Sequence, residues 1–171
     1  TLAVVGDVEL ELVLKLAEAA FGKSATSGPP PKVAAEPSFD GPRTSRKELQ
    51  KAQSHVVLGF PGARVSDGWR RPLEILSTIL SGQSGRLFLE LRDKQSLCYS
   101  VSSMSVEGVD PGYFAIYIGT SPQKVPEAVA GIRAELSRVR DERVTAAELE
   151  RAKQHLLGVH EVGLQRNGAR A

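Results

Sequence analysis

Cysteine is almost absent from this chain of 171 residues, which has one, Cys98. A lone cysteine excludes a disulfide within the chain and a zinc site built from several thiolates. The chain also lacks an apolar run of about 18 residues, the length that a membrane-spanning helix needs. No basic segment followed by an apolar one opens the sequence, so it shows no signal peptide. These absences leave the cellular compartment open.

An excess of charge of one sign is also lacking, since 22 Lys and Arg stand against 20 Asp and Glu. The basic residues are dispersed, whereas nucleic-acid binding usually needs a clustered basic face. What the chain does have is a composition typical of a globular domain with a sizeable core, 41% apolar and 25% charged residues. It opens in an apolar run without Met and stops near the end of a helical pattern, so we expect a segment of a longer protein.

The spacing of apolar residues predicts strands and helices in a mixed order. We interpret residues 1–171 as a single domain, crossed by a Pro-rich surface linker at residues 23–46. Helices gathered on one face of a mainly antiparallel sheet of about four to six strands, an α+β two-layer sandwich, fit this order. The predicted elements are a strand at 2–5, a helix ending near 21, a strand at 55–62, two helices between 67 and 95, a hairpin of 99–106 with 113–120, and helices following 122 and 145.

Histidine is the commonest zinc ligand, and His155 and His160 lie on one predicted helix. Five residues of α-helix separate two side chains by about 140° around the axis, which points them apart. Zinc-binding pairs lie four apart, as in the motif His-x-x-Glu-His, which this sequence lacks. We therefore expect no catalytic metal to be bound by this segment.

Three further patterns have ordinary structural interpretations. Residues 82–86, GQSGR, lack the spacing of a phosphate-binding P-loop and fit a helix start with a flexible joint. The serines between 100 and 105 lack the Gly-x-Ser-x-Gly elbow of a nucleophile and fit a strand. Cys98 has no evident neighbour that would lower its pKa, so we interpret it as a small residue packed under a strand.

The stretch GRLFLELRDKQSLCYSV, residues 85–101, runs from a predicted helix into a predicted strand. Arg92 stands near the break and Tyr99 just past it. Taken alone, Arg92 could neutralise a helix C-terminus, and Tyr99 could be a half-buried aromatic of a strand. Composition does not separate these structural roles from a functional one.

Residues 85–101 resemble the signature of the pitrilysin/insulinase-type zinc metallopeptidases, in the branch of the bacterial enzymes and the mitochondrial processing peptidases. Arg92 and Tyr99 match the family's Arg/Tyr pair, including the seven-residue step. Residues 2–22, 55–62 and 145–158 resemble further segments of the family's second-domain module, in the family's order. The resemblance therefore covers nearly the whole chain.

The sequence departs from the family pattern at three points. Gly85 stands where the family often has Ser, and Ser96 where Gly is usual, so we expect a tighter or differently angled loop. The zinc motif His-x-x-Glu-His is missing. In this family the motif lies in the domain that precedes the one resembled here, so its absence is expected for this segment.

The resemblance implies the non-zinc domain of a zinc-dependent endopeptidase, part of a chamber that binds unfolded or short peptides. Tyr99 would donate its hydroxyl to the substrate carbonyl oxygen or the developing oxyanion, and Arg92 would bind substrate backbone or hold Tyr99. Zinc would belong to an N-terminal domain or a partner subunit, in a dimer or a two-half clamshell, and this segment alone would be inactive. The bacterial cytoplasm and periplasm are both compatible compartments.

Two other functions remain open at the level of sequence. The chain could be a non-catalytic partner subunit of the same family that binds peptides or has a structural role. It could also be a protein-interaction domain without a link to proteolysis, because a fold does not fix a function. Whether one polypeptide carries both the zinc motif and the Arg/Tyr pair distinguishes the first of these from a complete enzyme.

Overall fold

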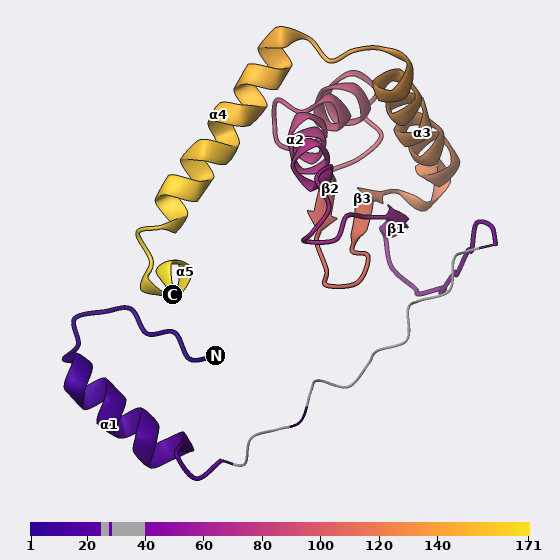
Figure 1. Ribbon diagram of the computed structural model, residues 1–171. Helices are drawn as coiled ribbons and strands as arrows, with labels where there is room; N and C mark the ends of the chain where they lie inside the picture. Colours follow the sequence, from indigo (N-terminus) through magenta and orange to yellow (C-terminus); the bar gives the residue numbers. More distant parts are fainter. Residues whose placement is uncertain (25–27, 29–39) are drawn as a thin grey trace. The chain divides into compact units, whose positions relative to one another are not determined.

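The computed structural model describes residues 1–24, 28 and 40–171, and these fall into two compact units (Figure 1). One unit contains the N-terminal segment together with residues 157–171, and the other contains the remaining described residues up to 156. The linker predicted at residues 23–46 lies mostly outside the described residues. The interpretation of residues 1–171 as one domain stays a prediction.

The N-terminal unit contains α1 (Leu10–Phe21), the end of α4 (Ala146–Gly163) and the short α5 (Asn167–Arg170). None of the residues of α1 is buried, and the side chains of Leu10 and Leu14 are 70% and 60% exposed. The strand predicted at residues 2–5 is wrong, because these residues form no strand. An apolar run becomes a strand only beside another strand that accepts its backbone hydrogen bonds, and no described strand does so here.

The larger unit is built on an antiparallel sheet whose strand order is β1-β3-β2. The strands are β1 (Ser54–Pro61), β2 (Ser100–Val106) and β3 (Tyr113–Thr120). The predicted hairpin is confirmed, since β2 pairs with β3 and Ser102 lies opposite Tyr117. Within the described ranges the sheet has three strands rather than the expected four to six.

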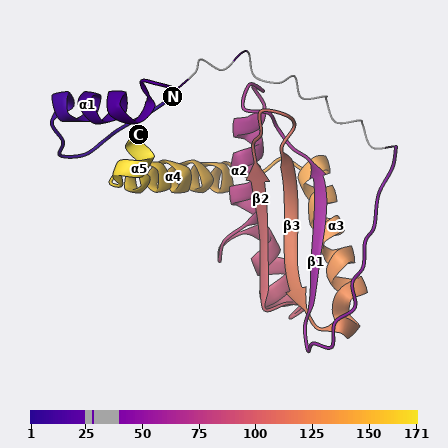
Figure 2. The same ribbon diagram turned by 90° about the horizontal axis from the view of Figure 1, so that it is seen from below.

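Helices cover one face of this sheet, as Figure 2 shows for α2 (Arg70–Leu80) and α3 (Val125–Asp141). Two further elements complete the layer, the π-helix η1 (Phe88–Lys94) and the short 3₁₀ turn η2 (Pro122–Lys124). The α+β class with helices on one sheet face is confirmed. No helix within the described part of the chain is long and apolar enough to cross a membrane. The largest fully buried side chains of the core are Leu80, Leu87, Leu91, Ile116, Ile118 and Ile132.

The opposite face of the sheet is not covered by the described helices. Successive residues of a strand point to opposite faces, and on this face Val57 is 63% exposed and Tyr113 48%. On the helix-covered face, Ile116 and Ile118 of the central strand are fully buried. The core therefore lies in a single layer between the sheet and η1, α2 and α3.

Candidate functional site at the corner between a helix and the sheet

The helix that carries Arg92 ends in a cap that turns the chain toward the sheet. The N–H of Leu97 donates to the carbonyl of Leu91 at 2.8 Å, and the N–H of Ser96 donates to the carbonyl of Arg92 at 3.1 Å. Ser96 has a positive φ of 51°. This pair of hydrogen bonds around a left-handed residue is the Schellman motif, and the buried side chains of Leu91 and Leu97 supply the apolar contact that accompanies it.

Residues after the cap are fixed by hydrogen bonds from the sheet and from η2. Thr120 donates its hydroxyl to the carbonyl of Leu97 at 2.5 Å, and the Lys124 ammonium donates to the carbonyl of Ser96 at 2.9 Å. The N–H of Tyr99 donates to the carbonyl of Gly119 at 3.2 Å. The seven-residue step from Arg92 to Tyr99 is thus the length of one helix cap and its entry into the sheet.

The cap brings the side chains of Arg92 and Tyr99 together. The guanidinium carbon of Arg92 lies 5.5 Å from the centroid of the Tyr99 ring and 4.5 Å from the centroid of the Phe88 ring. Both distances fall within the range of cation–π attraction. Tyr99 is 76% exposed. Because Tyr99 has the same strand parity as Val101, its side chain leaves the sheet on the helix-covered side, where Arg92 stands.

Cys98 lies between these two residues in sequence but does not share their exposure. Its side chain is half-buried and packs against the core cluster, in agreement with the interpretation from sequence. Burial raises the pKa of the Cys98 thiol, and the positive charge of Arg92 lowers it by a smaller amount. The thiol therefore stays protonated at neutral pH, which does not suit a nucleophile.

A buried ion pair fastens the start of this helical segment to α4. Arg86 donates to both carboxylate oxygens of Glu148, at 2.6 and 2.9 Å, with side chains only 12% and 16% exposed. Thr145 donates its N–H and its hydroxyl to the same carboxylate, and Glu148 returns its own N–H to the Thr145 hydroxyl. These hydrogen bonds form a capping box at the start of α4, where a helix is predicted after residue 145. The hydrogen bonds from Arg86 and Thr145 lower the pKa of Glu148 to about 2.

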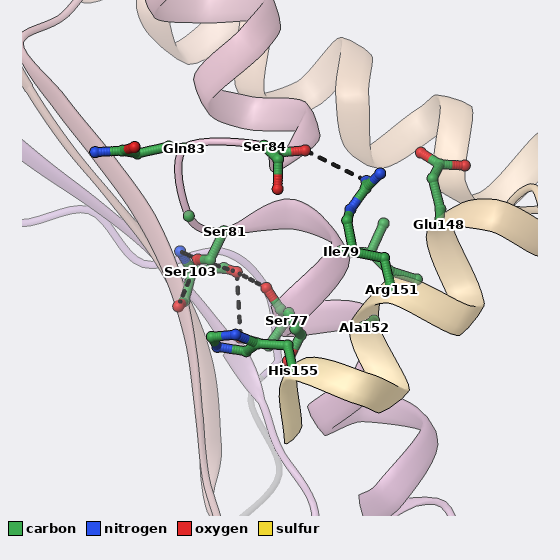
Figure 3. Close-up of a pocket in the computed structure, with 12 residues that line it drawn as sticks. Ser77, Ile79, Ser81, Gln83, Ser84, Ser103, Glu148, Arg151, Ala152 and His155 are labelled. Carbon is green, nitrogen blue, oxygen red and sulfur yellow. Dashed lines mark hydrogen bonds between the residues drawn. The ribbon is translucent and has the colours of Figure 1, made fainter. Parts of the chain in front are cut away.

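A cleft of about 660 Å³ lies next to this ion pair, between the end of α2, the following turn, β2 and α4 (Figure 3). Its inner wall is held by Ser81, whose hydroxyl donates to the Ser103 carbonyl at 3.0 Å and accepts from the Ser103 N–H at 2.6 Å. The side chains of Ser81 and Ser103 thus join α2 to the outer edge of β2. The residues lining the cleft are Ser77, Thr78, Ile79, Ser81, Gly82, Gln83, Ser84, Ser103, Glu148, Arg151, Ala152 and His155.

Sequence patterns identified part of this arrangement. They singled out Arg92 and Tyr99, which the fold brings together, but missed Phe88, although its spacing of four from Arg92 is that of neighbours on a helix surface. They also missed Arg86 as the partner of Glu148, because the two are 62 residues apart and no local rule joins them. Across residues 1–24, 28 and 40–171, no group of three His, Cys, Asp or Glu side chains could hold a metal ion.

Comparison with known proteins places the whole arrangement in a family. The model of the family described as the peptidase M16 inactive domain matches residues 1–156. An uncharacterized zinc protease of Streptomyces coelicolor is 35% identical over 179 residues, which cover 98% of this chain and 38% of the relative. An uncharacterized zinc protease of Bacillus subtilis is 32% identical over 124 residues, covering 72% of this chain and 30% of the relative.

A solved structure agrees with these relatives. The crystal structure of a protease from Helicobacter pylori superimposes with a TM-score of 0.83 at 27% identity, covering 96% of this chain and 41% of that one. The chain thus spans less than half the length of each of these relatives. The resemblance inferred from residues 85–101 is confirmed: this chain belongs to the peptidase M16 family, in the part of the family described as its inactive domain.

Proposed function

We propose that this chain is the non-zinc domain of a zinc-dependent endopeptidase and forms part of its peptide-binding chamber. In this proposal Arg92 and Tyr99 bind the peptide and stabilise the oxyanion during hydrolysis. The proposal draws on relatives that are named zinc proteases and are more than twice as long as the matched segment. It also draws on the peptidase M16 family itself, whose description gives this domain as inactive.

The observation that carries the proposal is the exposed phenol of Tyr99 beside a guanidinium. Peptide hydrolysis places negative charge on the former carbonyl oxygen, and a preorganised hydrogen-bond donor at that oxygen lowers the barrier. Tyr99 is 76% exposed, and among the described residues its hydroxyl has no hydrogen-bond partner, so the O–H is available to a substrate. The Arg92 guanidinium, lying within 5.5 Å of the ring, adds positive charge next to that donor.

Phe88 supports the pair from the helix side. The Arg92 guanidinium carbon is 4.5 Å from the centroid of the Phe88 ring, so the cation lies close to two aromatic rings. An arginine side chain has many rotamers, and contact with two rings reduces the number that it samples. Phe88 is therefore a positioning residue in this proposal, acting through Arg92 rather than on the peptide.

Zinc does not fit the residues described here, so we assign no step of the reaction to zinc within this chain. Its three histidines include His155 and His160 on α4, and the described residues form no cluster that could hold a metal. In this proposal the metal belongs to an N-terminal domain or to a partner subunit. This chain would contribute the hydrogen-bond donor, the cation and part of the chamber wall.

Replacing Tyr99 by Phe tests the proposal in the assembled enzyme, because it removes one hydroxyl and keeps the ring beside Arg92. We expect kcat for a fluorogenic peptide to fall by about tenfold or more, with the melting temperature unchanged. Tyr113→Phe is the matched control, since Tyr113 is 48% exposed on the other face of the sheet. Unchanged turnover in Tyr99→Phe would remove the phenol from the mechanism.

A second function is favoured by the description of the family domain as inactive. The chain could be a non-catalytic partner subunit that binds peptide or has a structural role in the assembly. In that case Tyr99→Phe and Arg92→Gln would weaken peptide binding to the assembled protein while kcat stays constant. Measuring KM and kcat separately for both variants distinguishes this role from oxyanion stabilisation.

A further inference from the structure

The cleft beside α4 presents polar groups that the rest of the fold leaves uncommitted. Within the described residues, Arg151 forms no ion pair, and its single hydrogen bond, to the carbonyl of Ser84, is long at 3.4 Å. Figure 3 shows Arg151 reaching from α4 toward Ser84 across the cleft. A guanidinium has five N–H donors, so most of those on Arg151 remain available.

His155 adds a second donor on the same face of α4. Residues four apart on a helix lie one turn apart on the same side, which places His155 and Arg151 on one wall. The opposite wall carries Ser84 from the turn after α2, whereas the side chain of Gln83 points away from Arg151 and His155 (Figure 3). Hydroxyl, imidazole and guanidinium groups from two separate elements therefore line one space.

The one carboxylate that lines the cleft does not cancel this positive wall. Both carboxylate oxygens of Glu148 already accept hydrogen bonds from Arg86, and one of them also accepts a hydrogen bond from the N–H of Thr145. The ion pair with Arg86 neutralises the charge of Glu148 and keeps its oxygens turned to partners within the fold. Arg151 is then the charged group of the cleft whose charge no described carboxylate balances.

We infer that this cleft binds a carboxylate of a peptide, held by Arg151 and His155 on one wall and by the Ser84 turn on the other. The inference rests on the proposed function, because it takes the ligand to be a peptide. A guanidinium binds a carboxylate through paired, charge-assisted hydrogen bonds. A carboxylate therefore suits Arg151 better than a neutral ligand does. The carboxylate could be the C-terminus of the peptide or an acidic side chain.

The size of the cleft agrees with a short peptide end. Binding pockets for small ligands measure roughly 300 to 1,000 Å³, and this cleft measures about 660 Å³. The side chains of Ile79 and Ala152 are each 3% exposed and line it, so part of the lining is apolar. A carboxylate at Arg151 with one or two adjoining residues over this floor would fit into the space.

Titration of the full chain with three acetylated tripeptides tests the inference by calorimetry and by amide chemical shifts. The probes are Ac-Ala-Ala-Ala with a free carboxylate, the same peptide amidated, and amidated Ac-Ala-Asp-Ala. We expect the free carboxylate to bind at least about tenfold more tightly than its amide, with shifts at residues 81–84 and 151–155. Recovery of binding with the amidated Asp peptide would identify a side-chain carboxylate as sufficient, and its absence would identify the C-terminus.

Variants on α4 provide the matched comparison. Arg151→Gln and His155→Gln should each weaken binding of the free carboxylate, Arg151→Gln by about tenfold. Lys153→Gln removes a charge from the same helix, but two residues along α4 turn its side chain about 160° away from Arg151, so affinity should hold. Equal affinity for the free and amidated peptides, an equal loss in Lys153→Gln, or no binding of any probe would overturn the inference.

The test separates this inference from the proposed function. The amide shifts at residues 81–84 and 151–155 report on the cleft alone, because neither Tyr99 nor Arg92 lines it. If turnover falls in Tyr99→Phe while the free and amidated tripeptides bind alike, the carboxylate site fails and the oxyanion role stands. If the chain binds the free tripeptide more tightly than the amidated one while Tyr99→Phe keeps full turnover, the carboxylate site stands and the oxyanion role fails.

Discussion

At the scale of single residues, the left-handed backbone of Ser96 turns the chain between Arg92 and Tyr99. Its φ of 51° lies in the left-handed region, which costs a residue with a Cβ roughly 1 kcal/mol and costs glycine little. The resembled family usually has Gly at this position, and the serine there leads us to expect a tighter or differently angled loop. The cap nevertheless forms, because its two backbone hydrogen bonds and the buried Leu91 and Leu97 hold it.

Ser96→Gly should therefore raise the free energy of unfolding by about 0.5 to 1 kcal/mol, since relief of the left-handed strain exceeds the entropy that glycine adds to the unfolded chain. Urea unfolding at constant m-value measures the change. Ser121→Gly is the matched control, because Ser121 has an ordinary φ of −72° and offers no strain to relieve. A destabilised Ser96→Gly variant would show that the serine side chain itself supports the corner.

Glu148 gives the larger unit an acid-sensitive contact. Its pKa in the folded chain is about 2, against an ordinary value of 4.5, so the unfolded chain binds this proton more readily than the folded one does. The stabilisation is complete above about pH 5 and is lost as the pH falls toward 2. Allowing for some contact with water, the loss is on the order of 2 kcal/mol.

Glu148→Gln should remove this part of the pH dependence and weaken the chain at pH 7, because Arg86 stays buried without a charged partner. Unfolding free energies at pH 7 and pH 3 should differ by about 1 kcal/mol less in the variant than in the parent, because only part of the loss has occurred at pH 3. Glu150→Gln, on the same helix and exposed, should keep the parental difference. A variant with the full parental pH dependence would place the acid-sensitive group elsewhere.

At the scale of elements, the packing of α3 on η1 depends on the absence of a side chain at Gly131. A Cβ at this position would collide with the Cδ2 atom of Leu91, which is fully buried and has little space to move. The two helices approach closely here, and Leu91 also belongs to the cap that precedes Tyr99. Position 131 therefore influences the candidate site without touching it.

Gly131→Ala should lower the free energy of unfolding by about 1 kcal/mol or more, because overpacking outweighs the helix propensity that alanine adds. Gly158→Ala on α4 is the matched control, since a Cβ there meets no atom within 4 Å. That control should gain up to about 1 kcal/mol. Thermal or urea unfolding measures the change in the free energy of unfolding in both variants. Stabilisation of both would refute the close contact at Gly131.

The elements were predictable where the signal is local. The hairpin of β2 and β3, the helices α2 and α3, and the capping box at Thr145 all follow from spacing and turn residues. The π-helical form of η1 did not, because π-helices are rare and the apolar spacing of this segment predicts only a helix. The apolar run at 2–5 was misread as a strand, because pairing depends on a neighbour that the local sequence does not specify.

At the scale of the whole molecule, the candidate site was predictable only in part. Arg92 and Tyr99 came from a motif, and the fold explains the motif as one helix cap. The cleft and its Arg151 were not predictable, because they depend on how α4 meets the turn after α2, far away in sequence. The relatives extend well beyond the matched segment, so activity is a property to be tested in the whole assembly.

The division of labour proposed for that assembly gives a direct prediction for this chain by itself. The purified 171 residues should bind no stoichiometric zinc and show no peptidase activity, because the described residues offer no cluster of metal ligands. Elemental analysis after dialysis and hydrolysis of a fluorogenic peptide measure the two quantities. His155→Ala identifies any weak surface binding by α4, since such binding would fall in this variant. One zinc per chain together with zinc-dependent cleavage would contradict the proposal, since the hydrolytic centre would then lie within this domain.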